Sequence, residues 1–129
     1  MPSIFTRIIN GEIPSYKIDE DEHCYAFLDI NPNALGHTLC VPKKEVDKLF
    51  ELDTETYSHL MEFAKRIGGA LAQAVPCKRV GMAVVGLEVP HAHVHLIPIN
   101  EMHEMSFQTK VKMQENDMIS LVEKIKSKL

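Results

Sequence analysis

The sequence has no tryptophan, only three cysteines and no long apolar run. The cysteines, Cys24, Cys40 and Cys77, are odd in number and show no Cys-x-x-Cys spacing. This pattern argues against a disulfide framework and favours reduced thiols in the cytoplasm. No apolar stretch approaches the ~18 residues that suggest a membrane span, and the first residues lack the apolar segment of a signal peptide. We therefore expect a cytoplasmic protein with no membrane partner.

A basic surface is also missing. The 14 Lys and Arg residues against 18 Asp and Glu residues give a formal net charge of -4, whereas nucleic-acid backbones favour a basic face. We expect no nucleic-acid partner, although a single nucleotide needs only a local site. A chain of 129 residues can bury roughly two-thirds of its surface in one domain. We expect one domain over 1–129, with a core over 1–100 and a C-terminal extension over 101–129 that has no assigned role.

Apolar periodicity predicts an α+β fold. Helices are expected over residues 3–9, over about 54–75 with Asp53 as its N-cap, and over about 115–128 near the C-terminus. Short apolar or alternating runs predict strands at 16–19, 24–29, 38–41, 80–85 and 90–98. The strand at 80–85 has the composition of a buried one. Strands joined by short turns favour an antiparallel sheet of about five strands with a long helix packed on it.

Histidines are the most informative residues. His91, His93 and His95 alternate with apolar residues between Pro90 and Pro98. In a strand the three rings share one face of the sheet. Each neutral ring carries one donor and one acceptor that need partners when buried. Three adjacent rings therefore indicate a network or a ligand rather than ordinary core packing, and the alternative is an incidental solvated face.

Two chemistries compete for these rings. Neutral imidazoles bind zinc and copper, but zinc sites usually recruit cysteine or carboxylate ligands and no His-Glu-x-x-His motif is present. The other chemistry is attack on phosphorus by a neutral ring nitrogen, whose partner nitrogen donates its proton to an acceptor. Neighbouring rings can then donate hydrogen bonds to the phosphate oxygens.

The residues resemble the histidine triad (HIT) superfamily of nucleotide hydrolases and transferases, and are most similar to its branch of histidine triad nucleotide-binding proteins. The family pattern His-φ-His-φ-His-φ-φ, with φ apolar, matches residues 91–97, and segments 3–14, 26–32 and 36–44 resemble other family blocks. The resemblance implies a HIT-like fold, a homodimer and an enzyme without a cofactor. Its expected activity is at the α-phosphate of nucleoside phosphoramidates or dinucleotides, with a purine nucleotide as ligand and a nucleotidyl-histidine intermediate.

The same resemblance assigns roles to individual residues. His93 is implied to be the nucleophile, while His91 and His95 orient it and contact the α-phosphate, and His37 completes the set. Asp29 is implied to bind the ribose hydroxyls. The residues implied to line the nucleobase slot or flank the ribose are Phe5, Ile8, Ile13, Phe27, Leu28 and Ile30. From the residues alone, these six are core residues by default, because the pattern cannot distinguish a base slot from a hydrophobic core.

Two segments depart from the family pattern. The usual Gly-Gln-Ser/Thr-Val before the triad is Gly86-Leu87-Glu88-Val89 here. Glu88 thus stands where a hydroxyl residue helps to protonate the leaving group, and it is either a catalytic acid or a surface carboxylate. Many relatives also begin with a zinc-binding Cys-x-x-Cys, where this chain has Ser3 and Thr6, so we expect no structural zinc. Alternatives to an enzyme are a nucleotide-binding regulatory module with little turnover and a metal-binding histidine cluster.

Overall fold

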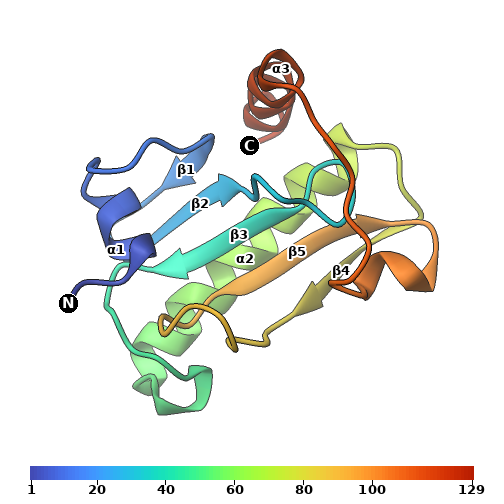
Figure 1. Ribbon diagram of the computed structural model, residues 1–129. Helices are drawn as coiled ribbons and strands as arrows, with labels where there is room; N and C mark the ends of the chain where they lie inside the picture. The colour runs from blue at the N-terminus through green and yellow to red at the C-terminus, as the bar shows by residue number, and fades with distance from the viewer.

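Five strands form one antiparallel sheet in the order β1-β2-β3-β5-β4 in the computed structural model, which describes all 129 residues. The strands are β1 (Lys17–Glu20), β2 (Cys24–Leu28), β3 (Thr38–Pro42), β4 (Arg79–Ala83) and β5 (Val94–Ile99). The helices are α1 (Ile4–Ile9), α2 (Thr54–Ala74) and α3 (Glu115–Lys126), with short 3-10 turns η1 (Leu49–Glu51) and η2 (Met102–Met105). The α+β class, the five-stranded sheet and the C-terminal helix are therefore confirmed (Figure 1).

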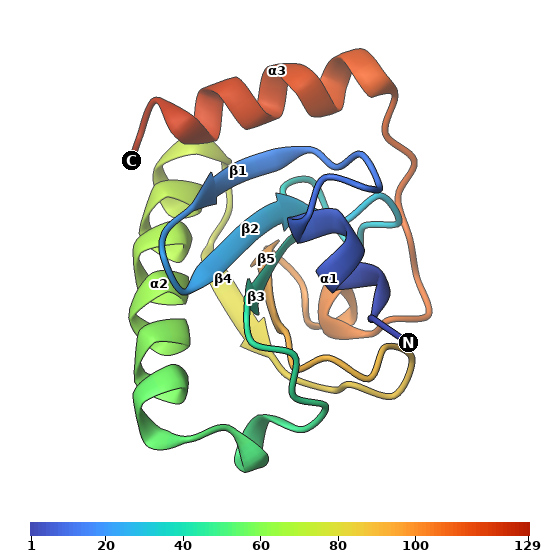
Figure 2. The ribbon, with the colours of Figure 1, turned by 90° about the vertical axis from the view of Figure 1, so that its left-hand side faces the viewer.

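The two faces of the sheet are covered differently. The long helix α2 packs along one face, and the short α1 lies over the other (Figure 2). Side chains alternate between faces along a strand, so Ala26 and Leu28 of β2 join a core cluster of 21 buried residues on the α2 side. Tyr25 and Phe27 join a smaller cluster of six buried residues with α1. Because α1 has only six residues, much of the sheet face on which it lies is left for other segments.

Helix α2 begins where the sequence predicts. The Asp53 side chain accepts a hydrogen bond from the Thr56 N–H, as an N-cap should. Helix α3 lies across one end of α2 and beside the edge strand β1 (Figure 2). Its buried residues Met118 and Ile125 belong to the same core cluster as α2. No helix in the structure is both long and apolar enough to cross a bilayer.

Two strands differ from the sequence-based expectation. The apolar run at 80–85 was expected to be buried, but β4 is an edge strand whose Met82 is 49% exposed. Val84 and Val85 lie beyond its end and are also exposed. The strand expected over 90–98 is observed only from Val94 to Ile99. Apolar composition cannot distinguish a central strand from an edge strand, because both contribute at least one face to a contact.

Candidate active site

The three triad rings lie on the α1 side of the sheet. Ala92, Val94 and Leu96 belong to the core beneath α2, so the alternating His91, His93 and His95 project the other way. The shared face predicted from the alternation is thus observed, although only His95 is inside β5. His93 and His95 line a pocket of about 460 Å³ together with Phe5, Asp29, Leu39 and Lys110. This volume is in the range of small-molecule sites.

The hydrogen bonds of His93 determine which of its nitrogens is free. Its Nδ1 lies 2.7 Å from the backbone carbonyl oxygen of His91, and a carbonyl can only accept, so Nδ1 carries the proton. Burial lowers the pKa of His93, which keeps the ring neutral at pH 7. Its Nε2 forms no hydrogen bond, and no fully buried side-chain nitrogen or oxygen lacks a partner. The Nε2 lone pair is therefore accessible from the pocket.

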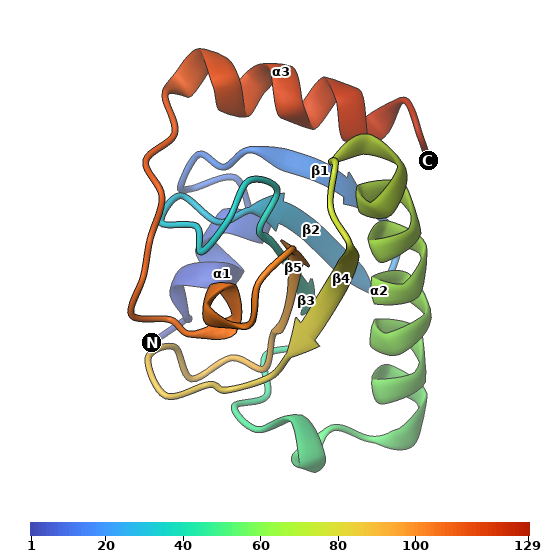
Figure 3. The same cartoon turned by 90° about the vertical axis from the view of Figure 1, so that its right-hand side faces the viewer.

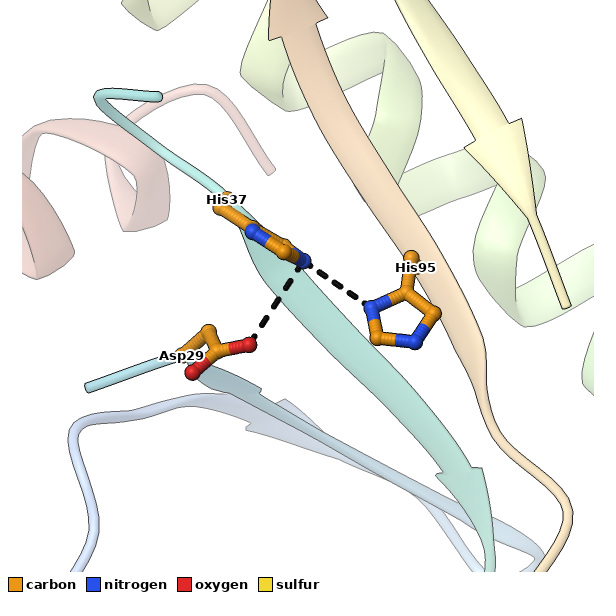
Figure 4. A group of neighbouring side chains, drawn as sticks. All are labelled: Asp29, His37 and His95. Carbon is orange, nitrogen blue, oxygen red and sulfur yellow. Dashed lines mark hydrogen bonds and ion pairs between the residues drawn. The ribbon is translucent and has the colours of Figure 1, made fainter. Parts of the chain in front are cut away.

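A second chain of hydrogen bonds gives His95 the opposite character. The Asn33 N–H donates to His37 Nδ1 at 2.9 Å, so the proton of neutral His37 is on Nε2. His37 Nε2 is 2.9 Å from His95 Nδ1 (Figure 4), which must accept, so His95 carries its proton on Nε2. Burial lowers the pKa of His37 to about 3 and that of His95 to about 4, so both rings are neutral at pH 7.

The pocket thus presents a lone pair and an N–H donor side by side. The rings of His93 and His95 have centroids 4.9 Å apart and meet edge to face. The free Nε2 of His93 can attack an electrophile, while the Nε2–H of His95 can stabilise negative charge next to it. Both rings are anchored through their Nδ1 atoms, which limits their reorientation.

Asp29, His37 and His95 are the residues that could together hold a metal ion. Each offers one ligand atom within 4.8 Å of the others, and Asp29 Oδ2 lies 3.6 Å from His37 Nε2 (Figure 4). Metal binding at His37 Nε2 would move its proton to Nδ1, where it would face the Asn33 N–H donor. The hydrogen bonds therefore fit a neutral relay, which runs from the Asn33 N–H through His37 to His95, better than an ion site.

Asp29 itself points toward this relay from the end of β2 (Figure 4). Its Oδ1 accepts a hydrogen bond from the Asn31 N–H at 2.8 Å, which leaves Oδ2 available at the pocket. Burial raises the pKa of Asp29, partly opposed by the Asn31 hydrogen bond. The carboxylate can accept hydrogen bonds from a polar ligand, as the predicted ribose contact requires.

The ring of His91 is placed differently from the prediction. It is fully buried, with Nδ1 2.6 Å from Ser3 Oγ and Nε2 2.8 Å from the Pro42 carbonyl oxygen. Both nitrogens are therefore occupied, and the ring has no free nitrogen for the predicted contact with a phosphate. His91 orients His93 through its backbone carbonyl instead.

The six residues predicted at the nucleobase and ribose divide into four groups. Phe5 lines the pocket, with its ring centroid 4.9 Å from that of His93. Ile8, Phe27 and the partly buried Ile13 pack in the small cluster around α1 and support the pocket from behind. Leu28 is only 1% exposed, and its side chain belongs to the core under α2 and not to the pocket lining. Ile30 is 80% exposed and is not a lining residue.

Sequence reasoning missed several lining residues, of which Phe107 and Lys110 lie farthest along the chain. The segment after η2 runs on the α1 side of the sheet (Figure 3). Phe107 and Lys110 belong to this segment and line the pocket. The Phe107 ring lies 4.7 Å from the His95 ring. Lys110 Nζ donates to Asn33 Oδ1 at 2.7 Å and lies over the Phe107 ring. This segment has no periodicity or motif that signals a site. Glu88, which the sequence did single out, is exposed and lines the same pocket.

Comparison with known proteins places this geometry in a family. The family model for the HIT domain matches residues 10–102. An adenosine 5'-monophosphoramidase of Saccharomyces cerevisiae is 41% identical over 96 residues, which cover 74% of this chain and 61% of the yeast protein. The chain belongs to the HIT family.

Solved structures agree with that assignment. A HIT-like protein from Bartonella henselae superposes with a TM-score of 0.86 and 30% identity, covering 98% of this chain and 96% of the other. A hypothetical histidine triad nucleotide-binding protein from Sulfolobus tokodaii superposes with a TM-score of 0.83 and 30% identity, covering 97% and 90%. The family thus includes proteins named for nucleotide binding and for phosphoramidase activity.

Proposed function

We propose that this protein is a nucleotide hydrolase or transferase that acts at the α-phosphate of nucleoside phosphoramidates or dinucleotides. The observation that carries this proposal is the neutral His93 ring, with its proton on Nδ1 and its free Nε2 at a pocket beside the N–H of His95. A nucleophile needs that lone pair, and a phosphate that gains charge during attack needs a neighbouring donor. The yeast relative named a phosphoramidase supports the same chemistry.

The reaction would proceed in two displacements. His93 Nε2 forms a bond to the α-phosphorus while the bond from phosphorus to the amine or nucleotide leaving group breaks. The leaving group takes a proton from the Glu88 carboxyl, to which the water of the second displacement returns one, and His95 donates a hydrogen bond to a non-bridging oxygen. Water then breaks the bond between Nε2 and phosphorus, which releases a nucleoside monophosphate and regenerates neutral His93. Phe5 and Leu39 would contact a purine base, and Asp29 would accept from the ribose hydroxyls.

The direct test is an assay with adenosine phosphoramidate. We expect the wild-type protein to release nucleoside monophosphate catalytically, without added metal. Calorimetry with a purine nucleoside monophosphate separates this function from its main alternative. Tight binding of the monophosphate together with no turnover of adenosine phosphoramidate would indicate a nucleotide-binding module instead of an enzyme. The exposed Leu87 and Glu88 at the pocket, which depart from the family pattern, motivate this test.

Glu88 provides a prediction about the leaving group. We expect Glu88→Gln to slow release of a poor amine leaving group by about 10- to 100-fold, because an amide cannot transfer the proton that a carboxylic acid can. A substrate with a good leaving group should be affected much less, and the Michaelis constant should change little. Steady-state kinetics with both substrates measure this difference.

Glu88→Ser is the matched comparison, since it places a hydroxyl residue where the family pattern has one. It should retain most of the turnover lost in Glu88→Gln. Equal rates in wild type, Glu88→Gln and Glu88→Ser would show that Glu88 is an exposed carboxylate without a catalytic role.

We also propose that two chains associate through β4. This edge strand is unpaired on one side, and Met82, Val84 and Val85 are exposed along it or just beyond its end. Unpaired strand edges with apolar side chains favour pairing with another chain. We expect solution scattering to give the mass of a dimer, and Met82→Asp with Val84→Asp to give the mass of a monomer. Ile119→Asp, which changes an exposed residue of α3, should remain dimeric, whereas a monomeric wild type would contradict the proposal.

A further inference from the structure

A chain of hydrogen bonds connects the start of α1 to the triad. Glu45 Oε1 accepts from the Ser3 N–H at 2.7 Å and from the Thr6 hydroxyl at 2.6 Å. Ser3 Oγ accepts from the Thr6 N–H at 3.1 Å as the N-cap of α1. The same oxygen lies 2.6 Å from His91 Nδ1. Ser3, which is itself buried, thus connects the exposed Glu45 and the partly buried Thr6 to the fully buried ring of His91.

The direction of each proton in this chain follows from its acceptors. His91 Nε2 lies 2.8 Å from the Pro42 carbonyl oxygen, which can only accept, so Nε2 carries the proton. Nδ1 of neutral His91 is then an acceptor, and the Ser3 hydroxyl must donate to it. The Ser3 oxygen separately accepts from the Thr6 N–H, and the other acceptor near its hydroxyl proton, Thr6 Oγ1, is farther away at 3.4 Å than His91 Nδ1 at 2.6 Å. Ser3 Oγ thus accepts one bond and donates one, and no fully buried polar side-chain atom is left without a partner.

The position of His91 matters because its carbonyl holds His93. That oxygen accepts the Nδ1 proton of His93 at 2.7 Å, and β5 begins only at Val94. The ladder of β5 therefore does not hold the His91 carbonyl. It is held by the bonds of the His91 ring and by two backbone bonds at 2.8 Å, from the His91 N–H to the Val89 carbonyl and from the Ala92 N–H to the Val46 carbonyl. If His91 were displaced, the Nδ1–H of His93 would lose its carbonyl acceptor, and the tautomer of His93 would no longer be fixed.

We propose that Ser3, held by Glu45 and Thr6, is a positioning residue that keeps His91 in its neutral tautomer and thereby keeps His93 ready for attack. This inference rests on the proposed function for its kinetic consequence, but its structural part concerns the tautomers alone. It assigns to the N-terminus of α1 a task beyond capping the helix. Ser3 does not touch the substrate in this proposal.

Three substitutions of Ser3 separate positioning from capping. Ser3→Thr keeps both the cap and the hydroxyl donor and should match the wild type. Ser3→Asp keeps a good cap, but a carboxylate only accepts, so His91 should become protonated on both nitrogens. Ser3→Ala removes the donor and the cap. We expect kcat to fall by roughly 5- to 20-fold in Ser3→Ala and Ser3→Asp, the size expected for loss of about one hydrogen bond.

The structural readout is nitrogen-15 NMR of the histidine rings in the intact protein. Wild type and Ser3→Thr should show His91 protonated on Nε2 only and His93 on Nδ1 only. Ser3→Asp should show a doubly protonated His91, and Ser3→Ala should show His93 as a mixture of tautomers. A role in capping alone would lower the melting temperature and raise KM through Phe5, yet leave both tautomers as in wild type, and that result would overturn the inference.

Glu45→Ala tests the outer part of the chain, with a smaller expected loss of kcat of about 2- to 5-fold. Its matched control is Glu12→Ala, which removes another exposed acid near α1, one that pairs with Arg7 at 3.8 Å, and should match the wild type. If the wild type shows no turnover at all, the proposed function fails, while the NMR spectra still decide the inference. Unchanged spectra in Ser3→Ala and Ser3→Asp would reject it whatever the kinetics.

Discussion

We expect His93→Ala to lower the release of nucleoside monophosphate from adenosine phosphoramidate by roughly 10⁴-fold or more, because loss of a covalent nucleophile removes the main pathway. The substitution deletes the free Nε2 and the hydrogen bond to the His91 carbonyl. Phe5 and Asp29 remain in the pocket, so calorimetry should still detect binding of the nucleotide. Steady-state rates for the two proteins provide the measurement.

The matched control for this experiment is His59→Ala. His59 lies on α2, which packs on the opposite face of the sheet from the pocket (Figure 2). Its ring stacks on that of His23, with ring centroids 3.8 Å apart. Its removal should leave the rate unchanged. Equal rates in wild type and His93→Ala would refute the nucleophile, whereas equal rates in wild type and His59→Ala are required for the comparison to be valid.

The covalent intermediate gives an independent view of the same prediction. Rapid quenching of a reaction in progress should yield a nucleotidyl adduct on the peptide that contains residue 93, detected by mass spectrometry. Neutral imidazole is the form that attacks, and burial lowers the pKa of His93, so the adduct should also form in mildly acidic buffer. An adduct on any other residue would contradict the assignment of His93.

Local sequence patterns predicted the parts of this site that depend on one segment. The alternation across 91–95 was sufficient to place three rings on one face, because side-chain direction in an extended segment has period two. The Asp53 cap and the helix after it were likewise predictable from neighbouring residues.

Contacts between distant segments could not be predicted in this way. The ring of His91 bonds to Ser3, 88 positions away, and to Pro42, 49 positions away, and no local signal in the sequence specifies either pair. Phe107 and Lys110 reach the pocket only because the chain after β5 returns along the α1 side of the sheet (Figure 3). The Leu28 side chain lies in the core because its position in β2 directs it toward α2. Long-range topology, rather than residue type, decided these cases.

The buried rings of His37 and His95 also predict how stability depends on pH. Burial lowers their pKa values to about 3 and about 4 in the folded protein, against 6.5 for an ordinary histidine. As the pH falls from about 7 to about 5, the unfolded chain takes up protons that the folded chain does not. The free energy of unfolding should therefore fall with pH, on the order of 2–4 kcal/mol over this interval.

Carboxylates with lowered pKa values do not contribute to a loss of stability between about pH 7 and pH 5. The pKa of Asp53 is lowered to about 2 by hydrogen bonds from Thr56 and Lys44, and the pKa of Glu45 is lowered by the Ser3 N–H. Stability contributed by such groups is complete above their unfolded values near 4 and is lost below them. Asp29 has a raised pKa because of burial, so it acts in the opposite direction and adds stability on acidification. A loss of stability above about pH 5 is therefore attributable to the histidines.

Urea unfolding at about pH 7, 6 and 5 measures this dependence. The double variant His37→Gln, His95→Gln should be less stable at neutral pH but should show a much flatter pH dependence, because it lacks both depressed groups. His23→Ala should keep the full wild-type dependence, since that ring is partly exposed. A wild type whose stability is constant between about pH 7 and 5 would show that the relay from Asn33 to His95 is not neutral when folded. The burial that makes the fold sensitive to acid thus also keeps His95 a neutral N–H donor beside His93. We therefore expect the double variant to lose both the acid sensitivity of its stability and its catalytic activity at neutral pH.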